Sequence, residues 1–206
     1  NFYNNLSKDQ FAKKDLLIHL SKKLNIKTIN SKVVRKILIE GNQIPHSYTK
    51  GAIYLDIIEK IIDFYNLKID FNNLFNSNII DIGGGIGSIL HCYFEFNKIN
   101  NFNKKALFIL LDQFPVSYIA KQNLEYFTEN KVSILSDNNS LINDSKMYVL
   151  QNTTSSKLTN LNISFYFNSS SFQEMEEYQV LDYCKFIENN AAEESYLASF
   201  LYPSNN

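Results

Sequence analysis

The chain has 206 residues, of which 45% are hydrophobic and 20% are charged, and its formal net charge is −1. This length suits one α/β domain with an appendage, or two small domains, and the hydrophobic content excludes wholesale disorder. No apolar run reaches the roughly 18 residues that a membrane span needs, so the sequence excludes an integral membrane protein.

The numbers of arginines and cysteines restrict which binding partners and which cellular compartment we expect. Arg35 is the only arginine among 20 basic residues, so the chain has almost no planar donor pairs for guanine or phosphate, and we expect no nucleic-acid partner. Cys92 and Cys184 are too few and too far apart for a disulfide framework or a zinc site. We therefore expect reduced thiols, no metal centre and, in the absence of a secretory signal pattern, a cytoplasmic protein.

The first seventy residues have helical patterning. Leucines recur at helical spacing over residues 6–24, and a second apolar segment covers residues 31–40. Glycine and proline mark residues 41–51 as a loop, and a helix with isoleucines on one face follows up to residue 65. We expect a helical cap region over residues 1–70 and a second unit over residues 71–206.

From residue 78 onwards, short apolar runs alternate with helical patterns. The expected strands cover residues 79–82, 106–111, 147–150, 163–167 and 196–202. The expected helices between them cover residues 86–97, 115–127 and 174–188. This alternation predicts an α/β fold with a parallel sheet and right-handed crossovers. Ligands bind at the carboxyl ends of the strands in such sheets, so the residues that follow each strand are the candidates for a site.

Segment 81–87 reads DIGGGIG, between a predicted strand and a predicted helix. Glycine suits a turn that needs unusual backbone angles and close approach of a ligand. A dinucleotide fingerprint G-x-G-x-x-G would need its third glycine at Ser88, whereas here it stands at Gly87. Asp81 would also place a carboxylate beside a pyrophosphate. The pattern therefore favours S-adenosylmethionine, which carries an amine and a sulfonium, over NAD.

The second predicted strand ends in Asp112. An acidic residue at this position accepts hydrogen bonds from ribose hydroxyls, which both NAD and S-adenosylmethionine carry. One helix and one strand fit between Gly87 and Asp112. Together, the glycine turn and Asp112 indicate a site for an adenosyl cofactor.

Segment 168–175 reads NSSSFQEM and follows the predicted strand 163–167. Taken in isolation, the serines and the glutamate of this segment would be explained by helix capping alone. Combined with segment 79–87 and with segment 108–112, which precedes Pro115, it resembles the class I S-adenosylmethionine-dependent methyltransferases. Its SFQEM core resembles, more narrowly, the sugar O-methyltransferases among them. The resemblance covers about residues 75–203.

The resemblance implies a Rossmann-like sheet, S-adenosylmethionine as methyl donor and a sugar hydroxyl of a surface glycan or its activated precursor as acceptor. It also implies roles for individual residues. The residues that would hold the methionyl end of the cofactor are Asp81, Gly83, Gly85 and Gly87, and Asp112 would bind the ribose. The residues that would border the transfer site and the substrate are Asn168, Ser171, Gln173 and Glu174.

Two features depart from this family. Gln113 and Phe114 intervene between Asp112 and Pro115, whereas the family has the proline directly after the acid. The sequence predicts only five strands, although class I sheets have seven. We therefore expect either a piece of a longer enzyme or a reduced, inactive version that lacks the last strands. A nicotinamide-dependent oxidoreductase and a non-catalytic binding module remain as alternatives.

Removal of a proton from the acceptor hydroxyl needs a general base. Glu174 is the first candidate by its position, and His46 in the loop 41–51 is the second. His91 and Asp137 are further candidates, although His91 suits a packing role on its helix. No clustered metal ligands are visible in the sequence.

Overall fold

The computed structural model describes residues 49–74, 76–100, 106–138, 141, 147–169 and 171–200. His46 and the predicted helical segments before residue 49 lie outside this described part. The chain there begins with helix α3 (Thr49–Tyr65) and the short helix α4 (Phe71–Leu74). The loop predicted over residues 41–51 is therefore wrong for residues 49–51, which form the start of α3. The reason is that Gly51 allows close packing against Ser88, the first residue of helix α5 (Ser88–Asn100), and does not form a turn.

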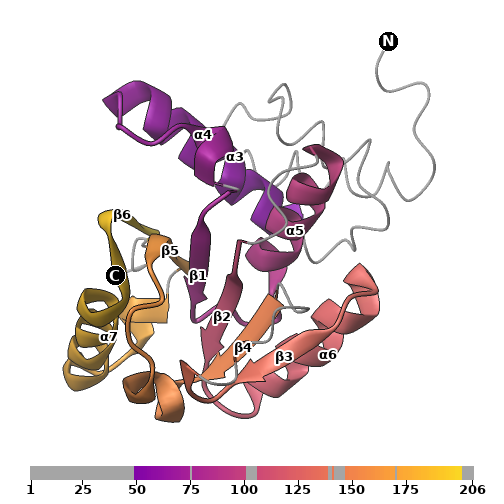
Figure 1. The fold of residues 1–206 in the computed structure, drawn as a ribbon, viewed down its shortest axis with the longest axis vertical. Coiled ribbons are helices and arrows are strands. Elements are labelled where there is room, and N and C mark those ends of the chain that lie inside the picture. The colour runs from indigo at the N-terminus through magenta and orange to yellow at the C-terminus, as the bar shows by residue number, and fades with distance from the viewer. Residues whose placement is uncertain are drawn as a thin grey trace, which may run out of the picture.

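A parallel sheet occupies the centre of the described part (Figure 1). Its strands are β1 (Asn78–Ile82), β2 (Phe108–Asp112), β3 (Val132–Leu135), β4 (Met147–Gln151), β5 (Ile163–Ser169) and β6 (Ala191–Phe200). They lie in the order β3-β4-β2-β1-β5-β6, and every neighbouring pair is parallel. The predicted α/β fold with a parallel sheet is confirmed, and the carboxyl ends of all strands meet at one edge.

Helices cover both faces of the sheet. On one face, α3 packs with α5 (Ser88–Asn100) and α6 (Val116–Thr128) against inward-facing strand residues. On the other face, α7 (Glu177–Asn190) contributes Tyr183 and Phe186 to a second apolar cluster. Figure 1 shows α7 on the left of the strands, with α5 and α6 on the right.

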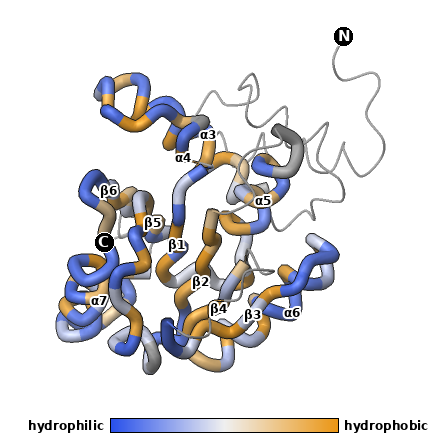
Figure 2. The backbone as a smooth tube through the Cα atoms, viewed as in Figure 1, coloured by the Kyte–Doolittle hydropathy of each residue, from blue (hydrophilic) through white to orange (hydrophobic). Residues whose placement is uncertain are grey.

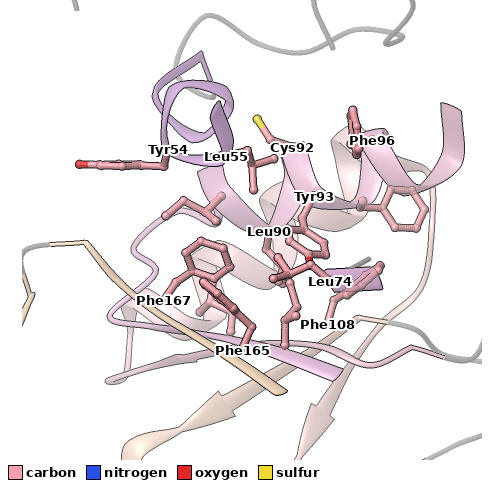
Figure 3. Close-up of a cluster of buried hydrophobic side chains, with 14 of the residues drawn as sticks. Tyr54, Leu55, Leu74, Leu90, Cys92, Tyr93, Phe96, Phe108, Phe165 and Phe167 are labelled. Carbon is pink, nitrogen blue, oxygen red and sulfur yellow. The ribbon is translucent and has the colours of Figure 1, made fainter. Parts of the chain in front are cut away.

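Strand β1 shows why the sequence of this sheet has continuous apolar runs. Ile79 faces the cluster beneath α3 and α5, whereas Ile80 and Ile82 face the cluster beneath α7. A strand that is buried on both faces has no polar side to alternate with. In Figure 2 the neighbouring strands β2 and β4 are accordingly mainly hydrophobic. Figure 3 shows the aromatic part of the first cluster, in which Tyr93 packs edge-on against Phe108 with ring centroids 5.4 Å apart.

The described part contains six strands, so the expectation of five was wrong. The missed strand, β3, has only four residues, and the exposed Ile134 interrupts its buried pattern because β3 lies at the edge of the sheet. Strand β6 also begins earlier than expected, directly after α7. Helix α7 begins at Glu177 and not at residue 174, because residues Ser171–Glu174 form a separate 3₁₀ helix, η6.

None of the helices in these described ranges has the length and apolar character that crossing a membrane requires. Within the same ranges, no group of three or more His, Cys, Asp and Glu side chains is placed to hold a metal ion. Cys92 is buried and Cys184 is exposed, and neither forms a disulfide bond.

Candidate functional site

The glycine turn connects β1 to α5 at the carboxyl edge of the sheet. Gly83, Gly85 and Gly87 have φ angles of +67°, +57° and +87°, which side-chain-bearing residues rarely adopt. A Cβ on Gly83 would lie 2.2 Å from Ser171 Oγ, whereas a Cβ on Gly85 would meet no atom within 4 Å. The turn is therefore packed against the chain at Gly83 and open at Gly85.

Asp112 stands at the end of β2 and holds the open part of the turn. Its Oδ2 accepts a hydrogen bond of 2.9 Å from the Gly85 N–H, and its Oδ1 accepts one of 2.7 Å from the Gln113 N–H. Burial raises the pKa of the Asp112 carboxyl above its ordinary value, and these two backbone N–H groups oppose the shift. The acid that the sequence singles out thus lies directly beside the glycine turn.

Asn168 and Ser171 join the end of β5 to the end of β1. The fully buried Asn168 amide donates to the Ile82 carbonyl at 3.2 Å and to Ser171 Oγ. Ser171 Oγ in turn donates to the same Ile82 carbonyl at 3.1 Å, and Asn168 Oδ1 accepts from the Phe172 N–H at 3.3 Å. Asn168 therefore lies behind the surface of the site and positions the Ser171 hydroxyl beside Gly83.

Two cavities flank the glycine turn, and both are lined by Gly83 and Gly85. The first, the Asp81 cavity, has a volume of about 210 Å³. Its other lining residues are Gly51, Tyr54, Asp81, Gly84, Ile86, Ser88, Ile89 and Ser169. The second, the Asp112 cavity, has a volume of about 350 Å³. Its other lining residues are Asp112, Gln113, Val116, Asn152, Ser171, Glu174, Met175, Gln179 and Tyr183.

Asp81 lies beneath the turn, with a side chain that is almost fully buried at 1% exposure. A Cβ on Gly84 would come within 2.7 Å of Asp81 Oδ2, so the absence of a side chain at Gly84 lets the backbone pass over the carboxylate. Asp81 thus lines the first cavity, whereas Asp112 lines the second. The two carboxylates lie on opposite sides of one glycine turn.

The candidate bases are placed very differently. Glu174, in η6, is exposed and lines the Asp112 cavity. His91 is fully buried in α5 and stacks on Phe127 of α6, with ring centroids 6.0 Å apart and an angle of 17° between the rings. Neither His91 nor Asp137 lines either cavity. His46 lies outside the described residues.

Two further sequence candidates lie away from the cavity walls. Gln173 is exposed in η6, and it is not among the residues that line the two cavities. Gly87 is covered by Leu124 of α6, which a Cβ on this glycine would approach to 3.0 Å. Gly87 therefore shapes the start of α5 and lines neither of these two cavities.

Sequence reasoning missed the contribution of α3. Gly51 and Tyr54 line the Asp81 cavity, although the sequence analysis assigns them to a cap region and gives them no role. The one available signal is a glycine near the start of a strongly apolar helical pattern, where close contact with another backbone is a possible reason for its presence. Among the other lining residues that sequence reasoning missed, Asn152, Gln179 and Tyr183 come from segments whose approach to the site depends on the order of the strands.

The parallel sheet, the glycine turn after β1 and the acid at the end of β2 together define a Rossmann-like fold of the class I methyltransferase type. Among solved structures, one from Plasmodium falciparum is similar over most of its length, with 14% sequence identity and a TM-score of 0.50, and the match covers 94% of this chain and 85% of that chain. It is described as a protein-L-isoaspartate O-methyltransferase in complex with S-adenosyl-L-homocysteine. At this identity the likeness concerns the fold.

A second solved structure with a weaker likeness is the magnesium protoporphyrin IX methyltransferase of Synechocystis PCC 6803 with bound S-adenosylmethionine. Its sequence identity is 11% and its TM-score is 0.41, and the match covers 95% of this chain and 82% of that chain. No protein-family model and no curated protein sequence matches the chain.

Proposed function

We propose that this chain binds S-adenosylmethionine and transfers its methyl group to an oxygen acceptor, a sugar hydroxyl. The observation that supports this most directly is the pair of cavities around one glycine turn, with Asp112 bound to the Gly85 N–H at 2.9 Å. In this proposal the adenosine part occupies the Asp112 cavity and the methionyl part occupies the Asp81 cavity. The turn between them supports the junction of the two parts.

The residues of the two cavities fit the groups of this cofactor. Asp112 offers a carboxylate to the two ribose hydroxyls, and Gly85 leaves open space where any side chain would project. Asp81 offers a negative charge on the other side of the turn, where the cofactor carries an ammonium and a sulfonium. NAD fits less well, because its pyrophosphate would lie near Asp81 without a compensating cation. The described residues that line the Asp81 cavity include no lysine, arginine or histidine.

When bound, S-adenosylmethionine supplies an electrophilic methyl group on a positively charged sulfur. Methyl transfer forms a bond from the acceptor oxygen to the methyl carbon and breaks the bond from that carbon to sulfur, and the hydroxyl proton has to leave. Glu174 is proposed to accept this proton, because it is the one of the described candidate bases that lines either of the two cavities at the glycine turn. A positioned base of this kind contributes roughly 10²–10⁴-fold to the rate, in addition to alignment of the reactants. His46 remains a sequence-based candidate for the same role.

The sugar acceptor rests on the NSSSFQEM segment and on its place in the fold. Ser171 and Glu174 of this segment line the Asp112 cavity, and Ser169 lines the Asp81 cavity. The segment therefore borders both parts of the proposed site, as a segment that recognises the acceptor should. Incubation with labelled S-adenosylmethionine and a panel of free, nucleotide-linked and polymeric sugars tests this part. Label transfer to proteins or to phenolic compounds, with none to any sugar, would contradict it.

Calorimetric titration with S-adenosylmethionine and S-adenosylhomocysteine tests the cofactor. We expect both to bind, and we expect Asp112→Ala to weaken both by tenfold or more, because a hydrogen bond to a charged group is worth about 1.5–3 kcal/mol. Asp63→Ala removes an exposed carboxylate of α3 outside both cavities and should leave the affinities unchanged. Tight binding of NAD without binding of either adenosyl compound would instead favour an oxidoreductase.

A further inference from the structure

Tyr54 brings an aromatic ring from α3 to the wall of the Asp81 cavity. Tyr54 belongs to the first apolar cluster, and Figure 3 shows its ring at one side of that cluster, away from Leu55, Cys92 and Phe96. It packs on Phe200 at the end of β6, with ring centroids 4.7 Å apart and an angle of 43° between the rings. With 2% of its surface exposed, the ring has a fixed position between α3 and the carboxyl edge of the sheet.

The Asp81 cavity combines features that suit a small cation. Asp81 contributes a carboxyl group that is almost fully buried, and Tyr54 contributes an aromatic residue to the same wall. The face of a tyrosine ring carries negative electrostatic potential. Ile86 and Ile89 add apolar surface, which limits the water that competes for a bound charge. A cation within about 6 Å of a tyrosine ring is attracted by the ring quadrupole, and this attraction grows when the cation is desolvated.

We propose that Tyr54 is a specificity residue that favours the positively charged sulfonium of S-adenosylmethionine over the neutral thioether of S-adenosylhomocysteine. This inference rests on the proposed function, because it concerns the same cofactor. Asp81 attracts the amino group of both compounds, and its attraction for the sulfonium is the same whichever side chain stands at position 54. Tyr54 separates them because only one of the two carries a charge on sulfur. Helix α3 thereby gives the site a preference for the donor and weakens its hold on the product after methyl transfer.

The test is the ratio of the two dissociation constants, that of S-adenosylhomocysteine divided by that of S-adenosylmethionine, measured by calorimetry. We expect Tyr54→Leu to lower this ratio by about 2- to 30-fold, the range that a cation–π contact supports. Tyr54→Phe keeps the ring and should keep the ratio within about twofold, because Phe also attracts cations. Since both ligands report on the same folded molecules, partial unfolding of a variant cancels in the ratio. Tyr54→Met is a second non-aromatic variant, with a side chain similar in volume to that of leucine.

Tyr93→Leu is the matched control, because Tyr93 is also a buried tyrosine but lines neither cavity. It should leave the ratio unchanged even where it lowers stability. An unchanged ratio in Tyr54→Leu or Tyr54→Met, with both ligands still bound, would overturn the role of Tyr54 and leave the proposed function standing. A fall in Tyr54→Phe equal to that in Tyr54→Leu would assign the effect to the hydroxyl and would also overturn it. If the unaltered protein bound neither S-adenosylmethionine nor S-adenosylhomocysteine, the proposed function itself would be overturned.

Discussion

Gly83 and Gly85 occupy one turn and share a positive φ, yet their surroundings differ. Ser171 fills the space where a side chain on Gly83 would be, whereas no atom lies within 4 Å of a Cβ on Gly85. Both glycines are required by the backbone conformation. Gly83 is required in addition by packing, and Gly85 by the space that it leaves between the two cavities. Residues of the same type in one motif therefore have separable roles.

Alanine substitutions should separate these roles. Gly85→Ala should cost about 1–2 kcal/mol of stability from its backbone conformation alone, and it should weaken S-adenosylmethionine binding because its methyl group enters the open space. Gly83→Ala should cost about 1–3 kcal/mol more, because its methyl group meets Ser171. Urea unfolding measures both costs. The added cost at Gly83 should fall in a Ser171→Gly background, and an equal cost in both backgrounds would exclude the clash as its cause.

Asp112 should change the free energy of unfolding with pH in the direction opposite to that of most carboxylates. Because burial raises its pKa in the folded protein, the folded state binds this proton more tightly than the unfolded state does. Its contribution to stability is therefore fully present below the unfolded pKa of about 3.9 and is lost as the pH rises through the folded pKa. Unfolding curves of the protein and of Asp112→Asn over the acidic range should diverge in this direction. Parallel curves would show that Asp112 titrates normally.

At the scale of elements, α3 and η6 complete a site that the sheet alone would leave open. Helix α3 adds Gly51 and Tyr54 to the Asp81 cavity, and η6 adds Ser171 and Glu174 to the Asp112 cavity. A buried asparagine also connects two neighbouring elements through hydrogen bonds. Asn190, at the end of α7, donates to the carbonyls of Leu158 and Phe186 and accepts from the Leu161 N–H, and so fixes the approach to β5.

The contact between α3 and α5 should not tolerate a side chain at Gly51. Glycine to alanine in a helix normally stabilises by roughly 0.5–1 kcal/mol. Here the new Cβ would lie 2.4 Å from the Ser88 carbonyl oxygen, so we expect Gly51→Ala to destabilise by about 1–3 kcal/mol and to weaken S-adenosylmethionine binding by displacing Tyr54. Urea unfolding and calorimetry measure the two effects, with Asp63→Ala as the control on the same helix. A stabilised Gly51→Ala protein would show that α3 does not pack closely on α5.

At the scale of the whole molecule, two apolar clusters on opposite faces of the sheet hold the site at its carboxyl edge. The parallel register sets the ends of β1, β2 and β5 side by side, since Ile82 pairs with both Leu111 and Asn168. This brings Asp112 and Ser171 to the same turn, although the two residues are far apart in the sequence. The two cavities are a consequence of that register.

The sequence by itself determined the α/β class, the glycine turn and the acid at the end of β2, because continuous apolar runs, turn glycines and strand-end acids are local signals. Only the tertiary structure decided that β4 lies between β3 and β2, since strand order depends on pairing between distant segments. It also decided that Asn168 is buried behind Ser171 and that Tyr54 of α3 reaches the site. These facts depend on which faces pack together, and an apolar helical pattern such as that of α3 is the same whether it covers a site or only a core.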